Sequence, residues 1–186
     1  MKNTTLSTFI SQIEKLEIGA DFSSRAEVIR ADALRAFSSS PVLNSLSSVS
    51  KSAGPEIVAD CVLLLGALKA MQHRIRTSCA AEWKEPQLGQ ARAHAYVDIW
   101  GRTDSLLSLL ENLLEQDASL KPSQILARFE VLSAGIKQAL SDNGQLLMLN
   151  GDGAVVGPFL TWALARWENC GFKQLNGSIL KELHTF

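Results

Sequence analysis

Apolar residues recur at helical spacing along most of the chain. In the first periodic segment, residues 5–18, the apolar positions are Leu6, Phe9, Ile10, Ile13 and Leu16. The second segment, residues 24–38, opens with Ser24 and Glu27, which have the spacing of a helix capping box. Both segments predict amphipathic helices, because apolar residues three and four apart share one helix face.

The longest periodic stretch covers residues 56–117 and contains a single proline, Pro86. Its first half has apolar residues on one face, which are Ile57, Cys61, Leu64, Leu68, Met71, Ile75 and Cys79. The second half has a face of its own, which includes Ala95, Ile99, Thr103, Leu106, Leu110 and Leu113. A proline moves the residue before it out of the helical region. We therefore predict a central antiparallel helical hairpin that turns near Pro86, with both faces in the core.

The connecting segments are rich in residues that favour turns. Residues 38–54 are dominated by serine, whose hydroxyl competes for backbone groups, and they predict a connector. A helix should follow Pro122, and another should follow the glycine-rich stretch 150–158. Within residues 146–156 a short β-hairpin is possible, with residues 154–156 as its second strand.

Composition supports a helical fold. The chain has 186 residues, of which 46% are hydrophobic and 6% aromatic, enough for one buried core. Leucine, alanine and serine are abundant and β-branched residues are sparse, which favours helices over sheets. We expect an all-α fold: one domain over residues 1–186, a single-domain bundle of about six to eight helices around the hairpin.

The glycine-rich stretch also has the form of a nucleotide loop, with Gly151, Gly153 and Gly157 spaced G-x-G-x-x-x-G. A dinucleotide site needs a buried strand before the glycines and an acidic residue at the end of a second strand. Neither pattern is present, and the spacing of acidic residues does not match a calcium loop. We interpret the glycines as a turn and expect no cofactor.

A basic strip lies on the first half of the hairpin. At about 100° per residue, Lys69, His73, Arg76 and Lys84 fall within an arc of roughly 80°, and Trp83 borders it. Positive charge beside an aromatic ring suits an anionic partner, such as an acidic protein surface. The alternative interpretation is a solvated helix face without a partner.

Catalytic and metal-binding patterns are weak. His94, Asp98 and Arg102 share one helix face, but no nucleophile can be assigned to them. The three histidines do not belong to a known metal motif. The three cysteines stand far apart in apolar segments, which is typical of core residues. We expect no catalytic residues and no metal.

One segment suggests a known family. RAEVIRADALRAF followed by LSSVSKSAG, within residues 25–61, loosely resembles the N-terminal region of TetR-type repressors. That resemblance implies a DNA-binding helix at PEIVADCVLLL, which carries Glu56 and Asp60 and has no Lys, Arg, Asn or Gln for DNA contacts. A net charge of −1 likewise argues against nucleic acid as the partner.

The patterns favour a non-enzymatic helical protein-binding module, an adaptor, regulator or effector-like protein that acts through the central hairpin. Its partner would be another protein, for example one with an acidic surface, and a homo-oligomer is an alternative. The alternative function is a small-ligand-sensing regulator, of a degenerate TetR-like kind, with an apolar pocket in the bundle. That pocket would be lined by Met71, Phe159, Trp162 and Trp167.

The N-terminus bears on the compartment. It has no unbroken apolar region like that of a secretory signal, and Asp60 and Lys69 interrupt the longest apolar run. We therefore expect a cytoplasmic protein without a membrane span. Ser, Thr and Asn dominate the first dozen residues and no acid precedes Glu14, a composition similar to bacterial type III secretion signals. A bacterial secreted effector is thus a lower-ranked alternative.

Overall fold

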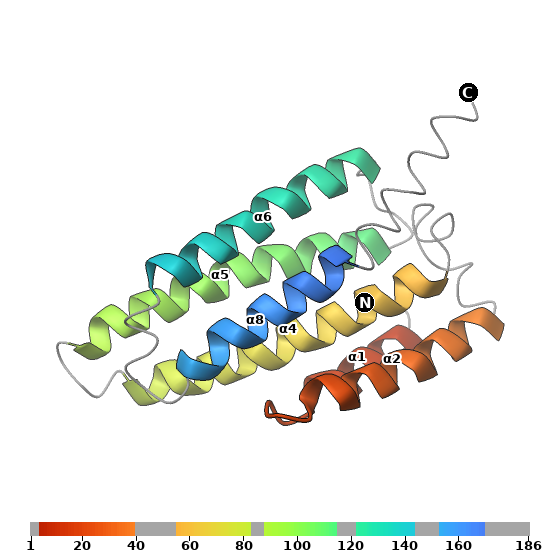
Figure 1. Ribbon diagram of the computed structural model, residues 1–186, viewed down its shortest axis with the longest axis horizontal. Coiled ribbons are helices and arrows are strands. Elements are labelled where there is room, and N and C mark those ends of the chain that lie inside the picture. Colours follow the sequence, from red (N-terminus) through yellow and green to blue (C-terminus); the bar gives the residue numbers. More distant parts are fainter. Residues whose placement is uncertain (1–3, 40–54, 83–87, 115–121, 144–152, 170–186) are drawn as a thin grey trace.

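The computed structural model describes residues 4–39, 55–82, 88–114, 122–143 and 153–169. Within these ranges the chain forms six α-helices, which are α1 (Thr4–Glu14), α2 (Phe22–Ser39), α4 (Pro55–Glu82), α5 (Leu88–Leu114), α6 (Pro122–Asp142) and α8 (Gly153–Trp167). They pack lengthwise into one bundle (Figure 1). The predicted all-α bundle is confirmed.

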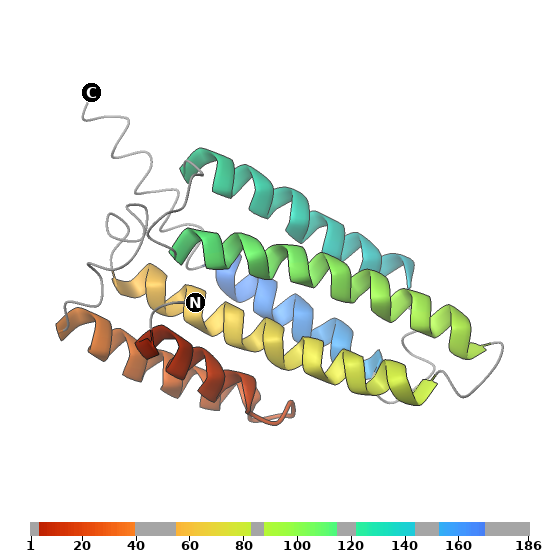
Figure 2. The same ribbon diagram turned by 180° about the vertical axis from the view of Figure 1, so that it is seen from behind.

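Helices α4 and α5 form the predicted antiparallel pair and lie side by side in both views (Figures 1 and 2). Polar groups join them along their length: Lys69 Nζ lies 3.5 Å from Glu111 Oε1, and the Gln72 amide donates to the Trp100 carbonyl at 3.5 Å. Between the two helices lies the buried thiol of Cys61. The connection at residues 83–87, including Pro86, falls outside the described residues.

Helix α4 is the centre of the bundle. The sequence pattern predicted one buried face, but every residue from 57 to 68 is buried. The single-face prediction was too narrow because α1, α2, α5 and α8 all pack against this helix. Residues 57–68 contain one ionisable carboxylate, Asp60, and are otherwise apolar apart from the Cys61 thiol, so the whole circumference can enter the core.

A glycine sets how closely α1 approaches α4. A Cβ atom added at Gly66 would lie 2.5 Å from the Cβ of Ile13 and 3.2 Å from the carbonyl oxygen of Ile10. A Cβ–Cβ separation of 2.5 Å is too short for real side chains. Gly66 therefore allows the backbone of α4 to meet the Ile13 face of α1 directly, and this contact fixes the place of α1 on the bundle.

The glycine-rich stretch differs from its prediction. Helix α8 begins at Gly153, so residues 154–156 are helical and the proposed second strand of a β-hairpin is wrong. Val156 is fully buried in the core, and this burial outweighs the weak helix propensity of valine. The proposed first strand, residues 146–149, and most of the connector 38–54 lie outside the described residues; α2 itself extends to Ser39.

The apolar surface of the helices is directed mainly inward. Among the described residues, the large hydrophobic side chains that are exposed are Val28, Val97 and Val131. No described helix combines the length and hydropathy that a bilayer span requires.

Candidate functional site

The predicted basic strip separates into residues with different environments. Lys69 is engaged by Glu111 across the α4–α5 pair, and both side chains are about one-third exposed. His73 and Arg76 are exposed on α4. Trp83 and Lys84 lie outside the described residues. The structure therefore keeps His73 and Arg76 together as accessible basic side chains on one helix.

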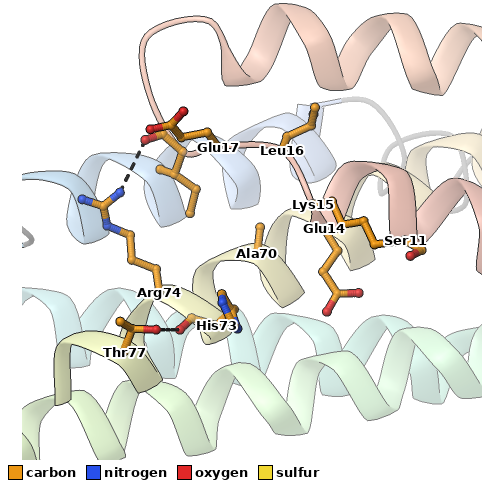
Figure 3. Close-up of a pocket in the computed structure, with 10 residues that line it drawn as sticks. Ser11, Glu14, Lys15, Leu16, Glu17, Ala70, His73, Arg74 and Thr77 are labelled. Carbon is orange, nitrogen blue, oxygen red and sulfur yellow. Dashed lines mark hydrogen bonds between the residues drawn. The ribbon is translucent and has the colours of Figure 1, made fainter. Parts of the chain in front are cut away.

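A surface pocket lies beside these two residues. It has a volume of about 830 Å³ and is formed by the end of α1, the connection to α2, and α4 (Figure 3). The residues that line it are Ser11, Glu14, Lys15, Leu16, Glu17, Ile18, Ala70, His73, Arg74 and Thr77. Of the predicted strip, His73 is the residue that lines this pocket.

The walls of the pocket are held by backbone and side-chain hydrogen bonds. Helix α1 closes with a tightened last turn, in which the Leu16 amide donates to the Ile13 carbonyl at 3.1 Å. The connection then passes Arg74, whose Nη1 donates to the carbonyl oxygen of Ile18 at 3.4 Å. On α4, the Thr77 hydroxyl donates to the His73 carbonyl at 3.0 Å. The pocket is thus built between two helices whose separation Gly66 fixes.

The pocket carries charges of both signs. The α4 wall contributes His73 and Arg74, and the opposite wall contributes Glu14, Lys15 and Glu17 (Figure 3). Two carboxylates, Glu14 and Glu17, therefore line the same pocket as Lys15, Arg74 and the His73 imidazole. Arg76 lies on α4 near this lining and adds a further positive charge. The prediction of a purely basic strip therefore did not include the acidic wall, which comes from another helix.

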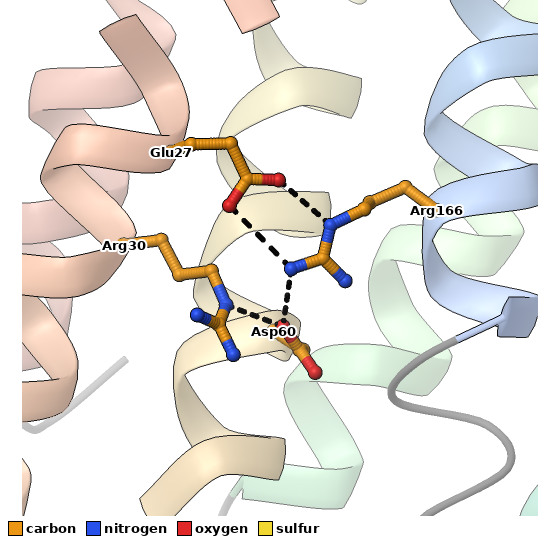
Figure 4. A network of polar contacts seen from close by, with 4 residues as sticks. All are labelled: Glu27, Arg30, Asp60 and Arg166. Atoms are coloured by element: carbon orange, nitrogen blue, oxygen red, sulfur yellow. Dashed lines mark hydrogen bonds and ion pairs between the residues drawn. The ribbon is translucent and has the colours of Figure 1, made fainter. Parts of the chain in front are cut away.

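A second group of charges, the Asp60 cluster of Glu27, Arg30, Asp60 and Arg166, lies where α2, α4 and α8 meet, with a buried Asp60 and three partly exposed partners (Figure 4). Arg30 Nε lies 2.5 Å from Asp60 Oδ1, and Arg166 Nη2 lies 3.1 Å from the same oxygen. Arg166 Nε also donates to Glu27 at 2.7 Å. The side chain of Asp60 is 1% exposed.

The Asp60 cluster joins helices and contains two positive and two negative groups. A buried carboxylate is stable only when it is paired and hydrogen-bonded, and two arginines from different helices supply this. From the sequence, Asp60 was interpreted as an interruption of an apolar run and as an acidic residue unsuited to DNA contact. A lone acid in such a run was the available signal, but its partners are 30 and 106 positions away.

The other residues considered for catalysis or metal binding are not brought together in the described part of the chain. His94 is exposed, and Arg102 Nε donates to Asp98 at 3.0 Å in an ordinary pair within α5. Cys61 is buried, and burial raises the pKa of its thiol well above the usual range, with smaller contributions from Asp60 and Glu111. A neutral, inaccessible thiol is a poor nucleophile. Across the described helices, no three His, Cys, Asp or Glu side chains are placed to share a metal ion.

The residues of the alternative apolar pocket belong to the packed interior. Phe159 and Trp162 pack against Phe22 with ring centroids 4.9 and 6.0 Å away. Trp167 contacts Phe129 instead, at 5.8 Å, and Met71 is fully buried. These four residues are therefore divided between different packing contacts, and their role as a ligand pocket stays a hypothesis.

The segment that the TetR resemblance assigned to DNA contact is the beginning of α4. Its residues from 57 onward are buried by neighbouring helices, so this face does not present side chains to a DNA groove. No protein-family model matches the chain, and no characterised protein or solved structure was found to be similar to it. Function is therefore argued from the geometry of the sites.

Proposed function

We propose that this protein is a non-enzymatic binding module that docks a segment of another protein in the pocket between α1 and α4. One observation carries the proposal: His73 and Arg76, which the sequence pattern selected, stand exposed on α4, and His73 also lines a charged pocket of about 830 Å³. Exposed charges on rigid helices can recognise a partner without reorganising first.

The chemistry of the walls indicates the kind of segment that would fit. Acidic side chains of a partner would pair with His73 and Arg76 on α4, and a basic side chain would meet Glu14 or Glu17 on the other wall. Leu16, Ile18 and Ala70 add apolar surface between the charged walls. Such a mixed pattern selects among partners, because an inverted arrangement of charges would be repelled.

The supports of the pocket favour a preformed site. Gly66 holds α1 against α4, and Arg74 binds the connection after α1 through the Ile18 carbonyl. Binding then costs little ordering of the backbone, and the interaction can be modest in area yet specific. We place this activity in the cytoplasm and propose an adaptor or regulatory role.

The test is a comparison of captured proteins. Immobilised wild-type protein, the double variant His73→Glu with Arg76→Glu, and the control Arg25→Glu would be incubated with extract of the native organism. Arg25 is exposed on α2 and is not a lining residue of the pocket, so its reversal controls for a change of surface charge. We expect a protein that binds the wild type and the control and is lost with the double variant. Equal capture by all three proteins would contradict the proposal.

A further inference from the structure

A second pocket, the α5–α6 groove, lies on another side of the bundle. It has a volume of about 460 Å³, and its lining includes Ser108, Leu109 and Asn112 of α5 with Arg128 and Val131 of α6. It shares no lining residue with the α1–α4 pocket. Helices α1 and α6 lie on opposite sides of the bundle in both views (Figures 1 and 2), so both pockets can be occupied together.

Val131 gives this groove an apolar contact surface. Its side chain is 71% exposed, although isolated exposed apolar residues are ordinary on proteins. What distinguishes Val131 is its position in a pocket, in which the buried side chain of Leu109, 4% exposed, belongs to the neighbouring helix. An apolar group of a partner placed here would be covered from two helices at once.

Arg128 gives the groove its charge. Among the lining residues, Arg128 carries the charge. Within the described part of the chain, its side chain forms no ion pair or hydrogen bond. A partner that brings a carboxylate to this exposed position would form a charge-assisted hydrogen bond with Arg128. Ser108 and Asn112 add neutral hydrogen-bonding groups on the opposite wall.

The length and the helical walls of the groove favour a helix as the occupant. Its α5 wall covers Ser108 to Asn112 and continues to Ser105, a length of roughly 10 Å, or about two helical turns. Both walls are helices whose backbone groups are already bonded, so no free edge is available to an extended strand. A single arginine is also too little charge to hold an anionic membrane surface.

We propose that the α5–α6 groove binds an amphipathic helix of a partner protein, with apolar residues on Leu109 and Val131 and an aspartate or glutamate on Arg128. This site is separate from the α1–α4 pocket and extends the proposed function. A chain with two independent docking surfaces can hold two proteins next to each other. The module would then work as an adaptor.

The probe for this proposal is a displayed library of helical peptides of about 14 residues, selected against the full chain. Each selected peptide would be measured by fluorescence anisotropy against wild type, Arg128→Glu, Val131→Asp, and the double variant His73→Glu with Arg76→Glu. Circular dichroism and thermal melting would establish that each variant is folded. Both groove residues are exposed, so their substitution should leave the core intact.

We expect the selected peptides to have an acidic residue beside an apolar face. Their affinity for Arg128→Glu and for Val131→Asp should be about tenfold or more below their affinity for the wild type. Their affinity should be unchanged in the double variant, which separates this site from the α1–α4 pocket. The proposal is overturned if no helical peptide is selected, or if the selected peptides bind both groove variants normally. Self-association of the wild type that Val131→Asp abolishes would assign the groove to a second copy and would also overturn it.

Discussion

Two groups of charged residues in this protein use the same side-chain chemistry in opposite surroundings. In the Asp60 cluster, between α2, α4 and α8, the buried Asp60 carboxylate is bonded to two arginines at 2.5 and 3.1 Å. In the α1–α4 pocket, Glu14, Glu17 and Lys15 are exposed at the surface. Burial therefore separates a structural carboxylate from the surface charges to which we assign binding.

The physical reason is the cost of removing a charge from water. A buried carboxylate without its partner is strongly unfavourable, so Asp60 requires its arginines for the fold to persist. An exposed carboxylate or histidine is solvated whether or not it is paired, and it contributes little to stability. Exposed charges can therefore change partners, and this makes them suitable for recognition.

The largest effect is expected at Asp60. Asp60→Ala leaves Arg30 and Arg166, whose side chains are only 18% and 20% exposed, without their shared carboxylate. We expect a loss of about 3 kcal/mol in the free energy of unfolding, at the lower end of values for broken buried pairs, because the arginines retain some solvent. Urea denaturation followed by circular dichroism measures it.

The control for Asp60 is Asp32→Ala. Asp32 pairs with Arg35 on the exposed side of α2, and such pairs contribute about 0–1 kcal/mol. Similar losses for the two substitutions would remove the distinction between the buried and the exposed charges.

The next effect concerns the contact that forms the pocket. In Gly66→Ala the new Cβ would meet Ile13 at 2.5 Å, and the strain should exceed the gain of about 1 kcal/mol that alanine brings to a helix. We expect a net loss of about 2 kcal/mol in the free energy of unfolding, as for other overpacked cores. Displacement of α1 should also weaken partner binding.

Gly101 is the matched position, because a Cβ there meets no atom within 4 Å. Gly101→Ala should stabilise the protein by about 0.5–1 kcal/mol through helix propensity alone. Opposite signs for the two substitutions, read from the same denaturation experiment, are the expected result. A stabilising Gly66→Ala would show that α1 is not held closely on α4.

The smallest effect on stability is expected at the pocket surface. The double variant His73→Glu with Arg76→Glu should change the free energy of unfolding by about 0.5 kcal/mol or less, because both side chains are exposed. Its partner binding should fall mainly through slower association, and wild-type binding should weaken as salt is raised. Surface plasmon resonance with the captured partner at two salt concentrations measures this. A large loss of stability would instead place these residues in a structural network.

The helices were largely predictable from the sequence because each buries a periodic set of apolar side chains. The start of α8 was not predictable, because residues 154–156 have no strong helix signal in the sequence. The burial of Val156 stabilises the helical conformation there. The central place of α4 was partly visible in its continuous apolar run. An interior glycine such as Gly66 also indicates close packing, although the sequence does not show which helix approaches it.

The candidate site was less predictable, because its walls come from separate helices. Spacing along α4 grouped Lys69 with His73 and Arg76, but it could not show that Glu111 of α5 engages Lys69. Neither could it show that Glu14 and Glu17 would face His73. Periodicity shows which residues are neighbours on one helix, whereas the charged residues that line this pocket come from different parts of the chain.

The most direct test of the central claim is site-specific photo-crosslinking at the α1–α4 pocket. A photoreactive amino acid would replace Thr77, which lines the pocket, or Thr161, an exposed threonine of α8 with the same kind of hydroxyl bond to its own helix. An extract of the native organism would be irradiated with each protein and the products identified by mass spectrometry. We predict a crosslinked partner from position 77, absent from position 161 and reduced by His73→Glu with Arg76→Glu. Equal crosslinking from both positions, or none from position 77, would contradict the assignment of this pocket as the binding site.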